Sequence, residues 1–116
     1  MLFRSKAFLE LWKKEYGDKI VPDFVSAHGW DGMMMVFDMI KATNGKFTSD
    51  EAMKFFSNYK TDKSVRGSFS IDPKERDAIQ DIYIRRHDWK DGKLQTVEFD
   101  VIKNVKDPWK ELNPPK

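Results

Sequence analysis

The sequence predicts an α/β fold in which three helices are followed by a short strand and a C-terminal β-hairpin. In the first half of the chain, apolar residues recur with the 3.6-residue period of a helix. In the second half they alternate with polar residues, as in half-exposed strands. Asp91-Gly92 lies between two alternating runs, which is the pattern of a two-residue hairpin turn.

The first helix is predicted over residues 2–16. Its apolar side consists of Phe8, Leu11, Trp12 and Tyr16. Charged residues fill the opposite side, as in an amphipathic helix that covers a core. Gly17 is a natural helix stop, and residues 18–23 form a connector.

The second helix is predicted over residues 24–43 and is apolar on nearly all sides, so we expect it to be sandwiched between two layers. Met33, Met34 and Met35 could be soft ligands for copper. Consecutive helical side chains diverge by about 100°, however, and methionine fills irregular gaps well, so core packing is favoured. Asp38 is expected to pair with Lys41 or Lys46.

The third helix begins at a capping box formed by Thr48 and Glu51. Its buried face is predicted to consist of Ala52, Phe55, Phe56 and Tyr59. The polar stretch 60–66 is expected to be a connector, and residues 67–71 a short strand that closes at Asp72-Pro73. A single turn of helix is predicted over residues 74–78.

The C-terminal hairpin is predicted from a strand over residues 79–89 and a return strand over residues 94–102. The proline-rich end of the chain is expected to lack regular structure, with Trp109 as an anchor. We therefore divide the chain into a folded segment, residues 1–104, and a tail, residues 105–116.

Composition limits the class of protein. The chain has 116 residues, 40% of them hydrophobic, which is enough for one modest core. Twenty-one basic and nineteen acidic residues are interspersed, so nothing predicts a nucleic-acid partner. There is no cysteine, no apolar stretch of the length that crosses a membrane, and no apolar run near Met1 typical of a secretory signal. We expect a soluble chain without an export signal.

Few residues suggest chemistry. His28 and Asp31 are three positions apart on a helix, which would suit a metal or acid–base pair, but two groups do not make a site. His87 is expected in a solvated position on a strand. No nucleophile has a visible base and orienting partner, so neither a catalytic residue nor a metal or cofactor is predicted.

Trp30 differs from these residues because a large aromatic side chain near the start of a buried helix can cover a pocket as well as a core. Core packing is the simpler interpretation, and the pocket remains the alternative.

The order of motifs resembles the late part of the solute-binding proteins of branched-chain amino acid type ABC transporters, the type I periplasmic binding proteins. The resemblance lies in the run 7–56, Gly29-Trp30-Asp31-Gly32 in place of the family's Gly-Tyr-Asp-Ala, Gly67–Asp72, Asp81–Arg86, Asp91–Lys93 and Val105–Trp109. Each motif alone is weak, but they occur in the family's order. The chain corresponds to only the C-terminal third of such a protein, an incomplete part of a two-lobe fold.

The resemblance implies a non-catalytic function. Two lobes would close around a small molecule such as an amino acid, an aromatic acid or another small carboxylate, and present it to an ABC permease in the periplasm. It places Phe24, Val25 and Trp30 near the ligand. The alternative is a small stand-alone interaction or sensory module that works by dimerising.

An incomplete fold should also expose apolar surface. We expect the strand at Phe69 to be parallel and to need neighbours that this chain does not supply. The second helix should likewise lack one cover, so self-association through the exposed helix and strand edges is predicted.

Overall fold

The structure is a computed structural model that describes residues 5–114. Its elements are α1 (Lys6–Tyr16), α2 (Phe24–Ala42), α3 (Ser49–Ser57), β1 (Lys60–Ser64), β2 (Gly67–Ile71), β3 (Ala78–Lys90), β4 (Lys93–Val105) and α4 (Pro108–Leu112). The three long helices, β2 and both strands of the hairpin confirm the predicted order, although residues 2–4 of the first predicted helix lie outside the described residues.

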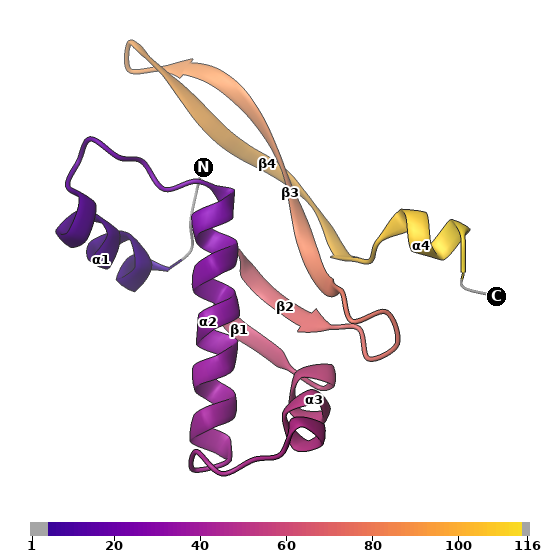
Figure 1. Cartoon of the computed structure of the whole chain (residues 1–116). Helices are drawn as coiled ribbons and strands as arrows, with labels where there is room; N and C mark the ends of the chain where they lie inside the picture. The colour runs from indigo at the N-terminus through magenta and orange to yellow at the C-terminus, as the bar shows by residue number, and fades with distance from the viewer. Residues whose placement is uncertain (1–4, 115–116) are drawn as a thin grey trace.

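The sheet is antiparallel throughout, with strand order β1-β2-β3-β4 (Figure 1). The expectation of a parallel strand at Phe69 was therefore wrong, because β2 finds a neighbour on each edge within the chain. A tight connection brings Ser64 opposite Gly67, whose φ of 106° suits glycine. The stretch predicted as a polar connector is thus β1, whose exposed side chains hid the strand from a hydrophobic pattern.

β3 and β4 form a long hairpin, as predicted. Asp91 and Gly92 both have positive φ, 52° and 71°, as the favoured two-residue turn requires. The pairing of β3 with β4 shifts register twice, between Gln80 and Ile82 and between Ile84 and Arg85. Figure 1 shows that the turn lies at the end of a twisted ribbon that projects from the rest of the molecule.

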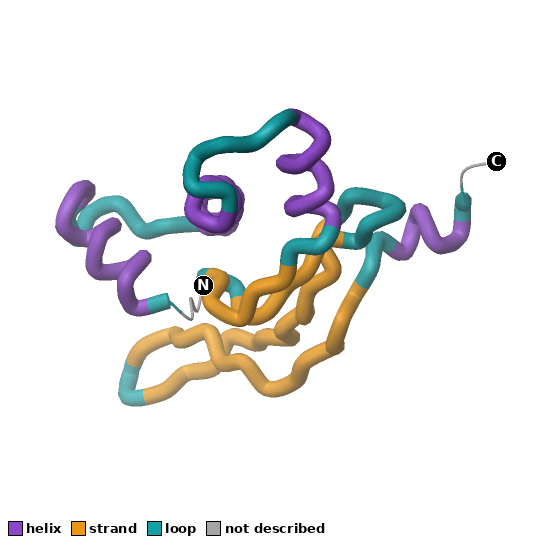
Figure 2. Tube along the Cα trace, turned by 90° about the horizontal axis from the view of Figure 1, so that it is seen from below, coloured by secondary structure: helices purple, strands orange, loops and turns teal. Residues whose placement is uncertain are grey.

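The helices α2 and α3 cover one face of the sheet (Figure 2). Both begin with a capping box: Asp23 with Ser26, and Thr48 with Glu51 as predicted. In the second box the Thr48 N–H donates to Glu51 Oε2 over 2.7 Å. These caps satisfy backbone donors that the first turn leaves unpaired, and so fix where each helix starts.

The core is small. Its buried cluster contains Phe8, Ala27 and Val65, with Trp12 and Trp30 packed against it. The Cα radius of gyration is 17.0 Å, against about 13 Å for a compact domain of this length. α2 is covered by the sheet on one side only, and of its four methionines only Met39 is buried. The predicted sandwich around this helix is therefore half built within the described residues.

Two local predictions near the C-terminus were wrong. The predicted turn of helix over residues 74–78 is absent: residues 73–75 form a turn, because the Asp72 carboxylate accepts hydrogen bonds from the Lys74 and Glu75 N–H groups, and Ala78 already begins β3. The tail contains α4, which Asp107 caps and in which Pro108 occupies the first turn, where proline is tolerated. The division at residues 104 and 105 stays a prediction.

Candidate ligand-facing surface

The N-terminal half of α2 is fixed to the sheet by one buried carboxylate. Asp31 is 3% exposed. The Ser64 hydroxyl donates to its Oδ2 over 2.7 Å, and the Val65 N–H donates to its Oδ1 over 2.9 Å. Arg66 Nε completes the set, 3.0 Å from Oδ2. With all these donors supplied by the β1–β2 turn, Asp31 holds helix and sheet together and is not free for the acid–base or metal role considered for it beside His28.

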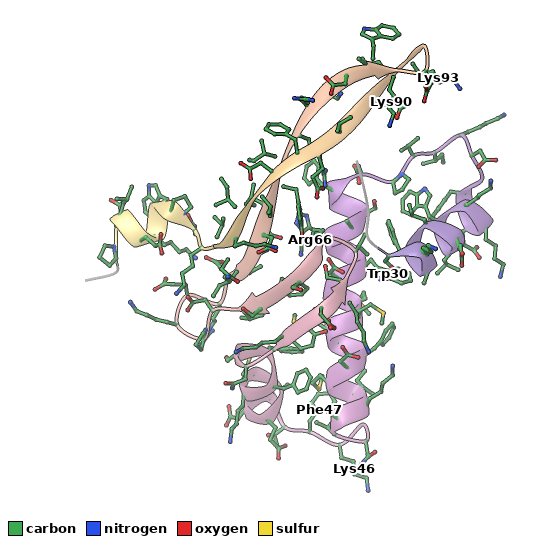
Figure 3. The ribbon with its side chains drawn as sticks, turned by 180° about the vertical axis from the view of Figure 1, so that it is seen from behind. Trp30, Lys46, Phe47, Arg66, Lys90 and Lys93 are labelled. Atoms are coloured by element: carbon green, nitrogen blue, oxygen red, sulfur yellow. The ribbon has the colours of Figure 1, made fainter. Side chains whose placement is uncertain are left out.

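Arg66 extends this anchor into the sheet. Its Nη1 donates to Gln80 Oε1 on β3 over 2.6 Å, and its guanidinium lies 5.5 Å from the centre of the Phe69 ring. In Figure 3, Arg66 lies where the β1–β2 turn meets α2. One side chain therefore links α2, β2 and β3. The sequence analysis placed Arg66 at the end of a polar connector, residues 60–66. Nothing in that polar stretch indicated that Arg66 would link a helix to two strands.

His28 lies one turn before this anchor, on the helix surface. Partial burial lowers its pKa from the ordinary value, and the nearby Arg66 charge lowers it further, while Asp31 opposes the shift. Its ring meets the Phe24 ring edge-on, with centroids 6.0 Å apart. The imidazole is therefore neutral near pH 7 and behaves as an aromatic neighbour of Phe24.

Phe24 and Val25, the first two residues of α2, are 56% and 60% exposed. The Asp23 cap positions them, since it fixes the first turn of the helix. Their exposure places two apolar side chains at the helix start without a cover among the described residues. Such a surface suits contact with a ligand or with another part of a larger fold.

Trp30 points elsewhere. Positions 24 and 30 are about 120° apart around a helix, so the two side chains do not share a face. Trp30 meets Phe8 of α1 edge-on, with ring centroids 5.4 Å apart. It borders an apolar hollow of about 360 Å³ between α1 and α2, whose other walls include Trp12, Tyr16 and Met33. Within this chain, the three predicted ligand-side residues are thus not brought into one pocket.

A second hollow, of about 290 Å³, lies on the other side of Trp30, between α2 and β1. Asp38 and Tyr59 both line it, and the Tyr59 hydroxyl donates to Asp38 Oδ2 over 2.7 Å. The expected pairing of Asp38 with a lysine was therefore wrong. Burial, and after it the bond to Asp38, raise the pKa of Tyr59 to about 12. Helical periodicity had marked Tyr59 as buried, but not its partner.

The remaining charged candidates lie on the hairpin. His87 Nδ1 is 3.2 Å from the Thr96 hydroxyl on the neighbouring strand. Arg86 pairs with Asp88 and Arg85 with Glu98, at 2.7 and 3.5 Å. Over residues 5–114, no three histidine, aspartate or glutamate side chains gather as metal ligands. The same residues contain no helix long and apolar enough to cross a membrane.

The comparisons with known proteins point in one direction. No protein-family model matches the chain. Leu/Ile/Val-binding protein homolog 6 of Brucella abortus is 31% identical over 105 residues, which are 90% of this chain and 27% of that protein. A solute-binding protein of an ABC transporter from Rhodopseudomonas palustris BisB5, in complex with 3,4-dihydroxybenzoic acid, is 41% identical with a TM-score of 0.77.

A similar protein from R. palustris HaA2, in complex with p-hydroxybenzoic acid, is 35% identical with a TM-score of 0.72. Both structural matches cover 90% of this chain and 28% of the other. Both solved structures are solute-binding proteins of ABC transporters. This chain corresponds to a segment of such a type I periplasmic binding protein, and it spans little more than a quarter of the length of the relatives that it matches.

Proposed function

We propose that this chain forms part of the ligand-binding component of an ABC importer for small aromatic carboxylates. The observation that carries the proposal is its 41% identity to a protein bound to 3,4-dihydroxybenzoic acid, against 31% to the Leu/Ile/Val-binding homologue. The function would be binding without catalysis: shape, hydrogen bonds and closure of two lobes would select the solute.

The side chains available at the start of α2 fit an aromatic ligand. Phe24 and Val25 offer exposed apolar surface, and the neutral His28 ring lies beside Phe24. Aromatic side chains favour stacked or edge-on contacts with a flat ring. Trp30 would act from behind, where it supports the helix start against Phe8 and fixes the shape of the wall. The ligand's carboxylate would be held by residues outside this segment.

The test is a chimera, because the chain spans only part of its relatives. The matching segment of the R. palustris BisB5 protein is replaced by residues 5–114, and titration calorimetry is run with 3,4-dihydroxybenzoate, 4-hydroxybenzoate and leucine. We expect heats for at least one hydroxybenzoate and none for leucine. Phe24→Ala should weaken binding by about tenfold, or 1.4 kcal/mol.

Trp109→Ala is the matched control, since Trp109 is 67% exposed and lies on α4, away from the start of α2. It should leave the affinity unchanged. A folded chimera that binds leucine and neither hydroxybenzoate would overturn the proposed ligand class, and equal effects of the two variants would remove Phe24 from the site.

The partner and compartment follow from the same proposal. The complete protein would deliver its solute to a membrane permease from the periplasm, as its class of relatives does. The alternative of a stand-alone dimerising module has no support among the relatives, all of which are solute-binding proteins.

A further inference from the structure

One face of α2 is apolar and uncovered. Met33, Phe37 and Ile40 are 52%, 46% and 39% exposed and are spaced by four and three residues, so they form a single stripe along the helix. Ala27 and Asp31, which are buried against the sheet, lie on the opposite side. The stripe therefore faces away from every strand. A helix with apolar residues on both sides is usually buried between two layers.

Two glycines in the same helix are unexplained by its present neighbours. Gly29 and Gly32 lie inside α2, where each costs about 1 kcal/mol relative to alanine. A Cβ added at either position would meet no atom within 4 Å. Nothing among the described residues therefore requires glycine there. Their value is to leave the helix backbone open, so that another segment can approach it closely.

The stripe continues into the hollow between α1 and α2. Met33 belongs to both, and beyond it the walls are Trp12, Tyr16 and Trp30. The uncovered surface thus joins a flat helix face to a groove lined by aromatic rings. Because it combines exposed helix residues with a hollow lined by aromatic rings, it has the apolar character of a domain interior cut open.

We propose that this surface, the stripe together with the adjoining hollow, docks the complementary portion of a solute-binding fold, that is, the part of its relatives outside the match. The segment matches a complete receptor with a TM-score of 0.77 over 28% of that receptor's chain. Its fold is therefore similar to that of the corresponding segment inside a complete receptor. In such a receptor, the side chains that face away from the segment's own sheet would face the rest of the fold. This holds whether the rest of the fold belongs to the same polypeptide or to a second one.

A second copy of the chain is the competing occupant. Two stripes could pair with each other across a twofold axis. That arrangement would draw nothing from the similarity of this segment to one part of a complete receptor. The proposal rests on the solute-binding fold and not on the identity of the solute, so failure of ligand binding leaves it standing.

The first experiment mixes this chain with the complementary portion of the R. palustris BisB5 protein and measures the mass of the product by sedimentation velocity. We expect a 1:1 complex. Phe37→Asp should weaken it by at least about tenfold, or 1.4 kcal/mol. Leu112→Asp, at an 82% exposed residue of α4, is the matched control and should leave the complex intact.

A second measurement guards against a complementary portion that does not fold alone. In the covalent chimera, Phe37→Asp should lower the melting temperature strongly. In the isolated chain, measured dilute enough to be monomeric, the same change at an exposed position should leave the melting temperature nearly unchanged. Leu112→Asp should have little effect in either. Equal effects of Phe37→Asp in both proteins, or a homodimer that the complementary portion does not displace, would overturn the proposal.

Discussion

At the scale of single residues, the structure depends on a few buried polar groups. Asp31 accepts from Ser64, Val65 and Arg66, and Asp38 accepts from Tyr59. With so small an apolar core, these bonds are a large share of what holds α2 to the sheet. A buried donor that loses its acceptor pays the full cost of desolvation, so the loss exceeds the net value of the bond itself.

Asp31→Ala should lower the free energy of unfolding by about 3 kcal/mol, because it leaves the partly buried Arg66 without its counter-charge and two further donors unpaired. Urea unfolding followed by circular dichroism measures the change. Asp18→Asn is the control, since the exposed pair of Asp18 with Lys13 should contribute less than about 0.5 kcal/mol. Equal losses would show that Asp31 is not an anchor.

Tyr59→Phe should cost about 1–2 kcal/mol of stability at neutral pH, because Asp38 loses its donor. The fold raises the pKa of Tyr59 from its ordinary 10.0 to about 12, which favours the neutral phenol. The contribution of the neutral Tyr59 phenol to folding stability is therefore complete below pH 10, and it is lost as pH rises from 10 to 12. Absorbance titration should show one tyrosine ionising near pH 12 that is missing in Tyr59→Phe. If the tyrosine that is missing in Tyr59→Phe ionises near pH 10 in the parent protein, the pKa of Tyr59 is not raised and the prediction is wrong.

At the scale of elements, the C-terminal helix is held by charge more than by apolar packing. Lys106 Nζ donates to Asp72 Oδ2 over 2.9 Å, and Lys110 pairs with Asp77, so two lysines bind α4 and its approach to the β2–β3 turn. Trp109 and Leu112 remain exposed. The bond from Lys106 and the N–H donors of the turn lower the pKa of Asp72 to about 2.

Lys106→Met combined with Lys110→Met should release α4, seen as faster amide exchange in residues 109–113, whose N–H groups include the hydrogen-bonded ones of this helix, with little change in β3 and β4. Acid should do the same to the parent protein. Since the pKa of Asp72 is lowered from 3.8 to about 2, its contribution is complete above pH 4 and is lost as pH falls toward 2.

Lys54→Met, on α3, is the control for the double variant and should leave exchange in α4 unchanged. Protection of α4 that survives both the double substitution and acid would mean that apolar packing holds the helix.

Elements with a strong periodic signal were predictable, and those held by distant partners were not. α2 and the hairpin turn follow from apolar spacing and from Asp91-Gly92. β1 is polar, so only its pairing with β2 makes it a strand. The three predicted ligand-side residues were placed near the ligand by family resemblance, and their role remains a proposal. They are Phe24, Val25 and Trp30. Arg66 and the Asp38–Tyr59 pair join segments 14 to 35 residues apart, a relation that no local pattern contains.

At the scale of the whole molecule, the chain is thin. Its principal dimensions are 54 × 39 × 19 Å, and the thinnest is close to the depth of one helix layer on one sheet layer. Apolar side chains are therefore covered on one side only, as for Phe37 and Ile40. A second layer packed on this uncovered face would bury these apolar side chains and so raise the free energy of unfolding.

Alone in solution, the chain should self-associate weakly through the uncovered stripe, as apolar surface of this extent favours. Light scattering at tens of micromolar measures the mean mass, and Phe37→Asp should return it to that of the monomer, 13.7 kDa. Leu112→Asp should not. A parent chain that stays monomeric at this concentration would show that the stripe needs no cover.

The Asp31 carboxylate also has an effect on the far side of its helix. By fixing how α2 is rotated about its own axis, it determines the direction in which Phe37 points. A mutation at Asp31 could then resemble a defect in assembly, even though every side chain of the docking face was chemically intact. The segment and the remainder of such a receptor would then fail to pack together because Phe37 points in the wrong direction.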